Sequence, residues 1–535
     1  MRRFGELMRR GDPAIWLAGA GLGVCLLMIG GMIAIILTSG LGFFWPDRLV
    51  EVTLKDGTVL LGEMSVREII PAPGSPELPP HFRIQLKLGN RDLFGADYRW
   101  VDEAEIASRA WPADAVYMER REYGPLLGRI VKVTDGNRII AQGSGPGWDA
   151  LVPLIDKAER DRSAIRRLER NEIGAVNARL DQARLALKKN PGARDSIERE
   201  AAALTGQYTL LEQRLGRQTE EAARTRVSVK VADGREKDLG TVDVFRAYRA
   251  NQLSIFARTR VYASRLWEFL SGDPRESNTE GGIFPAIFGT LMMVILMSLV
   301  AVPFGVVAAL YLREYAKQGV LVRVVRIAVN NLAGVPSIVF GVFGLGFFIY
   351  FLGGTIDRMF YAERLPTPTF GTGGILWASL TLGLLTVPVV IVAAEEALAA
   401  VPRSMREASL ATGATKFQTI LRVVLPAAAP GILTGLILAM ARGAGEVAPL
   451  MITGVVKLAP DLPLDGTFPF LHLERKFMHL GFHIYDVGFQ SPNVEAAKPM
   501  VYATAVLLLV IVVLLNLTAI IVRTRLRRKY QTSAF

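Results

Sequence analysis

The stretch 406–450 reads REASLATGATKFQTILRVVLPAAAPGILTGLILAMARGAGEVAPL. Its first half is polar and predicts a short helix followed by a turn at Gly413, where the missing Cβ removes a steric penalty. Its second half is apolar and long enough to cross a bilayer, yet it carries Arg442 and Glu446 near its middle. A charge at that depth is costly, so we expect both side chains to face a protein interior or a pathway.

The composition of the rest of the chain is that of a membrane protein with a polar insert. The chain has 535 residues, of which 51% are hydrophobic, and a net charge of +12. Its apolar residues are bunched into long runs. The basic residues mostly flank these runs, where they set membrane orientation, so the net charge does not indicate nucleic-acid binding. The single cysteine, Cys25, excludes a disulfide framework and a cysteine metal cluster.

Six apolar runs reach bilayer length, at 15–44, 283–312, 327–352, 373–394, 429–452 and 499–522. The first run is too long for a secretory signal core and lacks a small-residue cleavage site, so we interpret it as a retained anchor. Basic residues are concentrated at the N-terminus and at 313–326, 403–422 and 523–529. With six spans, all four basic segments fall on one side, and the rule for basic loops makes that side the cytoplasm.

The segment 45–282, between the first two spans, predicts an α+β insert on the outer side. Alternating Val50, Val52 and Leu54 before Asp56-Gly57 indicate a β-hairpin. A helix at about 150–189 that ends at Asn190-Pro191-Gly192, followed by a second helix, predicts an antiparallel helical hairpin at about 150–224. The second helix carries a coiled-coil seam at Ile197, Ala201, Leu204, Tyr208, Leu211 and Leu215. A further helix is predicted at 244–270, followed by a linker to the second span.

The polar half of the opening stretch carries a spaced motif. It consists of Glu407, Ala408, Gly413, Val423, Leu425 and Pro426. This spacing resembles the EAA loop of the permease subunits of type I binding-protein-dependent ABC importers, E-A-A-x3-G-x9-I-x-L-P. Ser409 and Val423 depart from the pattern by small changes. The resemblance implies a cytoplasmic coupling loop at 398–427 that is seated on an ATPase subunit, with Pro426 ending the segment before span five. The alternative is an ordinary amphipathic loop helix.

Three further segments resemble the permeases of phosphate importers: GGIFPAIFGT at 281–290, NLAGVPSIVFG at 331–341 and ARGAGEVAPL at 441–450. The last is of the PstA type. The resemblance covers about 281–525 and implies the six-helix type I permease fold in a bacterial inner membrane. It also implies a PstC-like partner permease, a PstB-like ATPase dimer that binds ATP and magnesium, and a PstS-like periplasmic phosphate-binding protein. Short members of the family lack the insert, so the resemblance assigns no role to it.

The charges of the apolar half suit an anion. Arg442 and Glu446 are four residues apart, so on a helix they share one face and can pair. A guanidinium presents a planar fork that matches phosphate oxygens. We therefore predict that Arg442 meets the passing anion and that Glu446 holds Arg442 when the site is empty. The alternative is a fixed ion pair that only specifies helix packing.

A second pathway element is predicted in span three, where Gly334, Pro336 and Ser337 interrupt the helical pattern. A broken helix can turn freed N–H groups toward an anion, although a simple packing kink is the alternative. In the outer loop, His479 and His483 have the spacing of two metal ligands on a helix. Loop histidines are mostly solvated or packed, so we expect no metal site.

The domain order predicted from the sequence is an N-terminal anchor (1–44), the insert (45–282), a permease core (283–525) and a cytoplasmic tail (526–535). No phosphate-binding loop of the form G-x-x-x-x-G-K-[ST] occurs, so we expect no ATP site and no enzyme activity in this chain. The predicted function is half of the translocation pathway of a phosphate importer. Two alternatives are a permease for another oxyanion, such as molybdate, sulfate or phosphonate, and a permease-like sensor or tether acting through the insert.

Overall fold

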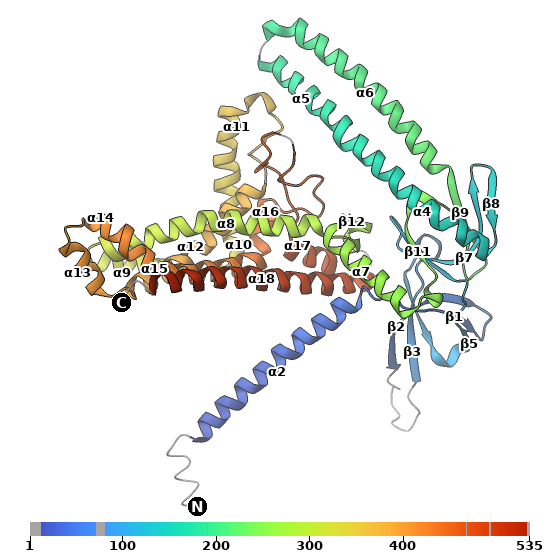
Figure 1. Cartoon of the computed structure of the whole chain (residues 1–535), viewed down its shortest axis with the longest axis horizontal. Helices are drawn as coiled ribbons and strands as arrows, with labels where there is room; N and C mark the ends of the chain where they lie inside the picture. The colour runs from blue at the N-terminus through green and yellow to red at the C-terminus, as the bar shows by residue number, and fades with distance from the viewer. Residues whose placement is uncertain (1–11, 71–80, 190, 467, 492–493, 532–535) are drawn as a thin grey trace, which may run out of the picture. The chain divides into compact units, whose positions relative to one another are not determined.

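In a computed structural model of the chain, the structure describes residues 12–70, 81–189, 191–466, 468–491 and 494–531 (Figure 1). They form two compact units. The membrane unit comprises Met1–Phe44, Ile283–Ile356 and Thr369–Phe535. The insert unit comprises Trp45–Gly282 together with Asp357–Pro368, which includes the last residues of span three and the start of the outer loop after it.

Six helices in the described residues are long and apolar enough to cross a membrane, which confirms the predicted number of spans. They are Ile15–Gly42, Phe284–Tyr315, Ser337–Phe360, Ile375–Ala399, Lys416–Gly445 and Val494–Arg528. The first of these belongs to α2 (Asp12–Gly42) and the last to α18 (Val494–Gln531). A Cβ at Gly40 would lie 2.8 Å from the carbonyl oxygen of Tyr502, so these two helices pack closely there.

The centre of the membrane unit is α12 (Ile375–Ala399), the most deeply buried of the six spans. It packs against α8 (Phe284–Leu310) and α15 (Leu425–Gly445) through small residues. A Cβ at Gly305 of α8 would lie 2.6 Å from Val390, and one at Gly435 of α15 would lie 2.6 Å from Ala393. Helices in a bilayer gain stability from such close approach, because burial from lipid supplies no hydrophobic driving force.

The insert unit contains two large antiparallel sheets and a two-stranded sheet of β12 (Pro274–Arg275) and β13 (Glu280–Gly281). The first has the strand order β4-β3-β2-β1-β5 and the second has the order β10-β9-β7-β6-β11, with β8 paired to β7. The predicted hairpin is confirmed, since β1 (Leu49–Leu54) and β2 (Val59–Ile70) pair from Leu49 opposite Glu63 to Thr53 opposite Val59. Gly57 in its turn has φ +87°, a conformation that glycine adopts without strain.

The remaining strands of the two large sheets are five to ten residues long. In the first sheet they are β3 (His81–Lys87), β4 (Tyr98–Asp102) and β5 (Ile106–Ala110). In the second sheet they are β6 (Val116–Arg120), β7 (Leu126–Asp135), β8 (Arg138–Gln142), β9 (Thr225–Lys230), β10 (Glu236–Gly240) and β11 (Val244–Tyr248). Each sheet covers its own apolar cluster, one around Val52, Ile84 and Leu86 and the other around Met118, Leu126 and Val227.

The helical hairpin is confirmed (Figure 1). One arm runs through α4 (Ser144–Arg167), the π-helical η2 (Leu168–Ile173) and α5 (Gly174–Lys189), and the other arm is α6 (Arg194–Ala223). All six residues of the predicted seam are buried or half-buried in the structure. The two arms are therefore held by the apolar spacing read from the sequence.

The predicted helix at 244–270 is wrong in its first part. Residues Val244–Tyr248 form β11, which pairs with β6, and α7 (Ile255–Ser271) begins only after Ser254. The side chain of Ser254 accepts a hydrogen bond from the backbone N–H of Ala257, the usual arrangement at a helix start. The segment carries Val, Phe and Tyr, which favour strands when a sheet edge is available.

Candidate functional site

The apolar half of the opening stretch is not one continuous span. Helix α15 ends at Gly445, Glu446 is extended at φ −76° and ψ 132°, and α16 (Ala448–Thr453) begins after it. Two glycines in the last turn weaken the helix, and Pro449 has no N–H to donate to the carbonyl oxygen of Gly445 in a continuous helix. The span predicted at 429–452 is therefore corrected to a span that ends at Gly445, with Arg442 in its last turn rather than near its middle.

Arg442 and Glu446 form the predicted ion pair at this corner. Arg442 Nε lies 3.5 Å from Glu446 Oε1, and the two side chains are 32% and 21% exposed. A pair of this length and exposure contributes on the order of 1 kcal/mol or less. In the described part of the chain, the two Nη groups of Arg442 donate no hydrogen bond. The fork of the guanidinium is therefore open to a ligand that carries oxygen acceptors.

The predicted interruption of span three is also present. Helix α9 (Val320–Leu332) ends before Gly334, and α10 (Ser337–Phe343) begins directly after Pro336. The span predicted at 327–352 is accordingly corrected to Ser337–Phe360, which runs through α10, the π-helical η8 (Gly344–Gly353) and α11 (Gly354–Phe360). The physical reason is Pro336, which has no N–H to donate and keeps the residue before it out of the helical region.

The two interrupted segments share one core. A Cβ at Gly341 of α10 would lie 2.7 Å from Cα of Pro449 in α16, so the two short helices are in direct backbone contact. Phe340 and Leu450 belong to the same buried cluster, and Val335 from the interruption packs against it. The structure thus brings together the segments that carry the two predicted pathway elements.

The predicted coupling loop is an exposed helix–turn–helix. Helix α13 (Arg403–Ala411) carries Glu407 and Ala408 on its exposed surface. Gly413 follows at φ +86° in the left-handed region, which favours glycine. Thr415 then caps α14 (Lys416–Thr419) through a reciprocal pair of bonds with Gln418.

Large apolar side chains stand exposed on this loop, at Leu410, Phe417 and Leu421. Exposed apolar residues that gather on one element mark a surface for a partner.

Pro426 does not end the segment before span five, which corrects that expectation. The helix runs without a break from Lys416 to Gly445. A π-helical stretch, η10 (Ile420–Val424), precedes Pro426, which lies in the first turn of α15. A proline is tolerated at that position, because the wider π-helical turn before it accommodates the hydrogen bond that Pro426, which has no N–H, cannot donate. Val423, Leu425 and Pro426 are half-buried at the base of the loop.

Sequence analysis missed the group that holds this loop to its neighbour. Arg406 donates to Glu314 Oε1 at 3.1 Å and to the carbonyl oxygens of Val401 and Leu398. Lys416 donates to the carbonyl oxygen of Glu314. Glu314 belongs to η7 (Tyr311–Tyr315) at the end of the second span. The two basic segments 313–326 and 403–422, predicted to lie on the same side of the membrane, are thus in contact.

The histidine pair of the outer loop is buried rather than solvated. His479 caps α17 (Leu480–Tyr485) by accepting from Gly481 N–H, and His483 Nδ1 lies 3.3 Å from Thr504 Oγ1. Burial lowers the pKa of both imidazoles to about 4, so both are neutral at physiological pH. Within the described ranges, no group of three or more His, Cys, Asp or Glu side chains has the geometry of a metal site.

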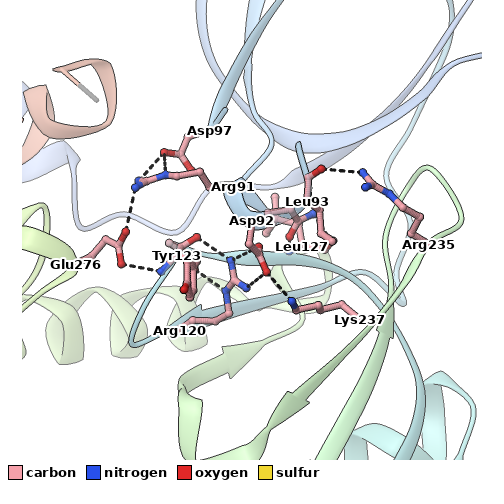
Figure 2. Close-up of polar contacts among 12 residues, drawn as sticks. Arg91, Asp92, Leu93, Asp97, Arg120, Tyr123, Leu127, Arg235, Lys237 and Glu276 are labelled. Atoms are coloured by element: carbon pink, nitrogen blue, oxygen red, sulfur yellow. Dashed lines mark hydrogen bonds and ion pairs between the residues drawn. The ribbon is translucent and has the colours of Figure 1, made fainter. Parts of the chain in front are cut away.

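A second concentration of charge lies in the insert unit, around the short helix α3 (Arg91–Phe94) (Figure 2). Arg120, which is buried, places its fork on Asp92 at 3.0 and 3.2 Å, and Lys237 reaches the same carboxylate at 3.0 Å. Burial alone would raise the pKa of Asp92, but Arg120 and Lys237 outweigh it and lower the pKa. A carboxylate satisfied in this way is part of the scaffold rather than a binding group.

The same network fixes the linker that leads to α8. Arg91 bridges Asp97 at 2.7 Å and Glu276 at 3.0 Å, and Glu276 accepts from Tyr123 N–H at 2.7 Å (Figure 2). Glu276 has φ +44°, a strained conformation for a residue other than glycine. The paired contacts to Arg91 and Tyr123 hold the linker in that conformation.

Comparison with known proteins places the membrane unit in a family. Residues 301–531 match the family described as "Binding-protein-dependent transport system inner membrane component". The protein YqgI of Bacillus subtilis (strain 168), a probable ABC transporter permease, is 31% identical over 223 residues, which are 40% of this chain and 70% of that relative. The chain belongs to this permease family.

Within the family, the chain is similar to proteins named PstA. The phosphate transport system permease protein PstA 1 of Mycobacterium tuberculosis (strain ATCC 25618 / H37Rv) is 40% identical over 172 residues, or 32% of this chain. The chain spans about half of that relative's length. Among solved structures, a chain of the MetNI methionine ABC transporter is similar, with 18% sequence identity and a TM-score of 0.33. The alignment covers 49% of the present chain and 98% of the MetNI chain.

The family match bears on the two sites differently. It contains the interruption before Ser337, the exposed loop and the Arg442–Glu446 corner, all of which lie within 301–531. The residues 45–282 lie outside it. The open guanidinium of Arg442 is therefore the candidate ligand contact of the permease core. The family match says nothing about the insert unit, whose role has to be inferred from its own surface.

Proposed function

We propose that this chain is a transport subunit of an ATP-driven phosphate importer and forms half of its translocation pathway. The observation that carries the proposal is the open fork of Arg442 at a helix corner, in a chain 40% identical to a PstA protein over 172 residues. Guanidinium groups bind phosphate through two parallel hydrogen bonds. The chain is itself no enzyme on this proposal, because its partners bind ATP and magnesium.

The corner suits an anion that must bind and then leave. The Arg442–Glu446 contact is long and partly exposed, so an oxyanion can replace Glu446 on the guanidinium at small cost. Glu446 then takes the guanidinium back when the anion departs, which keeps the charge of Arg442 paired. The freed backbone between α9 and α10, at Gly334, Pro336 and Ser337, is the further polar group on the proposed route.

Coupling to ATP hydrolysis is assigned to the exposed loop around Glu407 and Gly413. In the proposed assembly, the loop is seated on a PstB-like ATPase dimer in the cytoplasm, and a PstC-like permease forms the other half of the pathway. A PstS-like protein delivers phosphate from the periplasm, where the insert would lie. The exposed apolar side chains of the loop and its ties to Glu314 support this role. Movement of the ATPases would thereby bias the core between two arrangements.

Phosphate uptake in cells tests the proposal. Arg442→Gln is expected to abolish radiolabelled phosphate uptake, while Arg442→Lys, which keeps the charge but loses the fork, retains a small fraction. Arg525→Gln removes an exposed charge from α18 and serves as the matched control with normal uptake. Assembly with the ATPase is checked by pull-down for each variant.

Three outcomes separate this proposal from its alternatives. Unchanged uptake in Arg442→Gln makes the pair a packing device and removes Arg442 from the pathway. A wild type that assembles with an ATPase but imports molybdate, sulfate or phosphonate instead of phosphate keeps the permease role and changes the anion. A wild type whose phenotype depends on the insert and not on Arg442 identifies a sensor or tether.

A further inference from the structure

Helix α7 of the insert unit presents an unusual apolar stripe to its surroundings. Phe256 is 85% exposed, Trp267 is 70% exposed and Ile255 is 61% exposed. Phe256, Arg260 and Trp267 follow one another at helical spacing along the exposed face. The opposite face is packed, since Phe269 is buried and Arg265 binds Glu119 at 2.7 Å. The stripe is thus a fixed surface of a well-anchored helix.

Two neighbouring segments extend this stripe. The ring of Trp45 lies 6.0 Å from the ring of Tyr262 on α7. Asn251, just before α7, donates to the carbonyl oxygens of Leu49 and Pro112, and the exposed Trp111 lines one cavity with Arg48 and with Arg258 of α7. We call this surface the α7 patch and define it as Trp45, Trp111, Ile255, Phe256, Arg260 and Trp267.

Positive charge borders the patch. Arg48 and Arg260 are both exposed, and within the described residues neither has an acidic partner. A cavity of about 360 Å³ is lined in part by Arg48, Arg109 and Arg258, together with Trp111 and a single carboxylate among those lining groups, Asp47. The patch therefore combines large aromatic rings with cations and adjoins a basic hollow. That combination matches the headgroup region of a bilayer, where aromatic rings and arginines both gather.

The chain itself keeps α7 close to the bilayer. Trp45 is the third residue after Gly42, the end of the first candidate span, so it can lie no more than about 10 Å from that point. At its other end, α7 stops at Ser271, thirteen residues before Phe284 begins the second candidate span. A membrane-crossing helix thus precedes the patch, and another follows it closely. An exposed stripe of this size on a soluble surface marks an interaction site.

We propose that the α7 patch lies in the headgroup region of the membrane leaflet next to the insert unit and binds lipid directly. Phe256 and Trp267 enter the boundary between headgroups and acyl chains, and Arg48 and Arg260 contact lipid phosphates. The insert unit is then seated on the bilayer through an interfacial helix rather than held only by its four covalent connections to the membrane unit. This role is independent of which substrate the permease carries.

Spin labelling of the full chain in nanodiscs tests the proposal, and the single native cysteine simplifies it. In a Cys25→Ser background, Phe256→Cys and Trp267→Cys are labelled with a nitroxide, and Leu210→Cys on α6 serves as an equally exposed apolar control. The nanodiscs contain phosphatidylcholine and phosphatidylglycerol in equal parts. Accessibility is measured to oxygen, which enters lipid, and to a water-soluble nickel chelate.

The expected result is an oxygen-to-nickel accessibility ratio above one at 256 and 267 and below one at 210. A ratio below one at 256 and 267 means that the patch faces water and overturns the proposal. Low accessibility to both reagents means that protein covers the patch, either a second copy of the chain or a partner subunit, and also overturns it.

A second measurement tests the cation contact. On the labelled Phe256→Cys background, Arg260→Gln is expected to lower the ratio in discs with phosphatidylglycerol. The substitution should have a smaller effect in discs of phosphatidylcholine alone. Equal ratios with and without Arg260 in both lipids would remove the phosphate contact from the proposal.

Discussion

Arg406 donates a hydrogen bond to Glu314 at 3.1 Å, and this contact joins the exposed loop to the end of the second span. The two residues are 92 positions apart in the sequence, and their side chains are only 20% and 13% exposed. Lys416 adds a bond to the carbonyl oxygen of Glu314 and lies 4.9 Å from the ring centre of Tyr315. A displacement of the loop is therefore transmitted to η7 through these contacts.

On the proposed function, we expect Glu314→Gln to uncouple ATP hydrolysis from transport. The change removes the charge that Arg406 binds and weakens the contact by about 1 kcal/mol, or roughly fivefold. Phosphate moved per ATP hydrolysed, measured in proteoliposomes with the ATPase added, should fall by a similar factor. Glu396→Gln is the matched control, because Glu396 is an exposed glutamate in the last turn of α12, shortly before the loop begins. Equal losses in both variants would contradict a specific role for Glu314.

For the Arg442–Glu446 corner we predict a substitution that improves transport rather than impairs it. If phosphate must displace Glu446 from Arg442, Glu446→Gln removes a competitor and lowers the apparent KM for phosphate. The fall should be about two- to fivefold, since a pair of this exposure is worth about 1 kcal/mol. Initial uptake rates over a range of phosphate concentrations provide the measurement. A raised KM would instead show that Glu446 positions Arg442 for the anion.

Several features of both units could be predicted because their signals are local. The number of spans follows from apolar run length, and the seam of the helical hairpin follows from spacing along a single helix. The turn at Gly413 and the interruption before Ser337 follow from one glycine and one proline. In each case the residue that decides the structure lies within a few positions of its effect.

The errors share a different cause. Hydropathy does not register a chain reversal, so the corner after Gly445 was hidden in an apolar run even though Gly443, Gly445 and Pro449 marked it. Val244–Tyr248 is a strand because β6, more than a hundred residues earlier, offers an edge to pair with. The Glu314–Arg406 contact is equally remote. Pairings between distant segments depend on the fold, which a single sequence does not display.

Within the insert unit, the helical hairpin contacts the segment Asp357–Pro368, and cross-linking can test this contact. At the tip of the helical hairpin, Lys188 donates to the carbonyl oxygen of Glu363 at 2.8 Å, and Lys189 pairs with its carboxylate at 2.9 Å. In a Cys25→Ser background, Lys189→Cys with Glu363→Cys should join through a short bis-maleimide. Arg184→Cys with Glu363→Cys, more than one helical turn away, is the control and should join poorly.

The same contact has a predictable pH dependence. The hydrogen bond from Lys189 lowers the pKa of Glu363, so the contact is present above the ordinary carboxylate pKa and is lost as the pH falls through the lowered value. Because the site is exposed, high salt should weaken it as well. Cross-linking that is equally efficient for the control pair would mean that the hairpin tip has no fixed position relative to Glu363.

The stability of the insert unit should depend strongly on Glu119. This buried carboxylate accepts from Arg246 and Arg265, each at 2.7 Å. Burial alone would raise the pKa of Glu119, but Arg265 and Arg246 outweigh it and lower the pKa. Glu119→Gln takes the carboxylate from Arg265, while Arg246 keeps Glu268 at 3.0 Å, and the loss of one partner of a buried pair costs about 3–5 kcal/mol.

Limited proteolysis of the full chain in detergent measures this effect, with cleavage within 45–282 as the readout. The stabilising charge of Glu119 is present above the unfolded pKa and is lost as the pH falls through the lowered folded pKa, so wild type and variant should converge only in acid. Glu159→Gln is the control: Glu159 also binds an arginine, Arg121, but its side chain is 45% exposed, so the change should cost less than about 1 kcal/mol. Equal protease resistance in Glu119→Gln and Glu159→Gln at neutral pH would show that the buried charge does not hold the insert together.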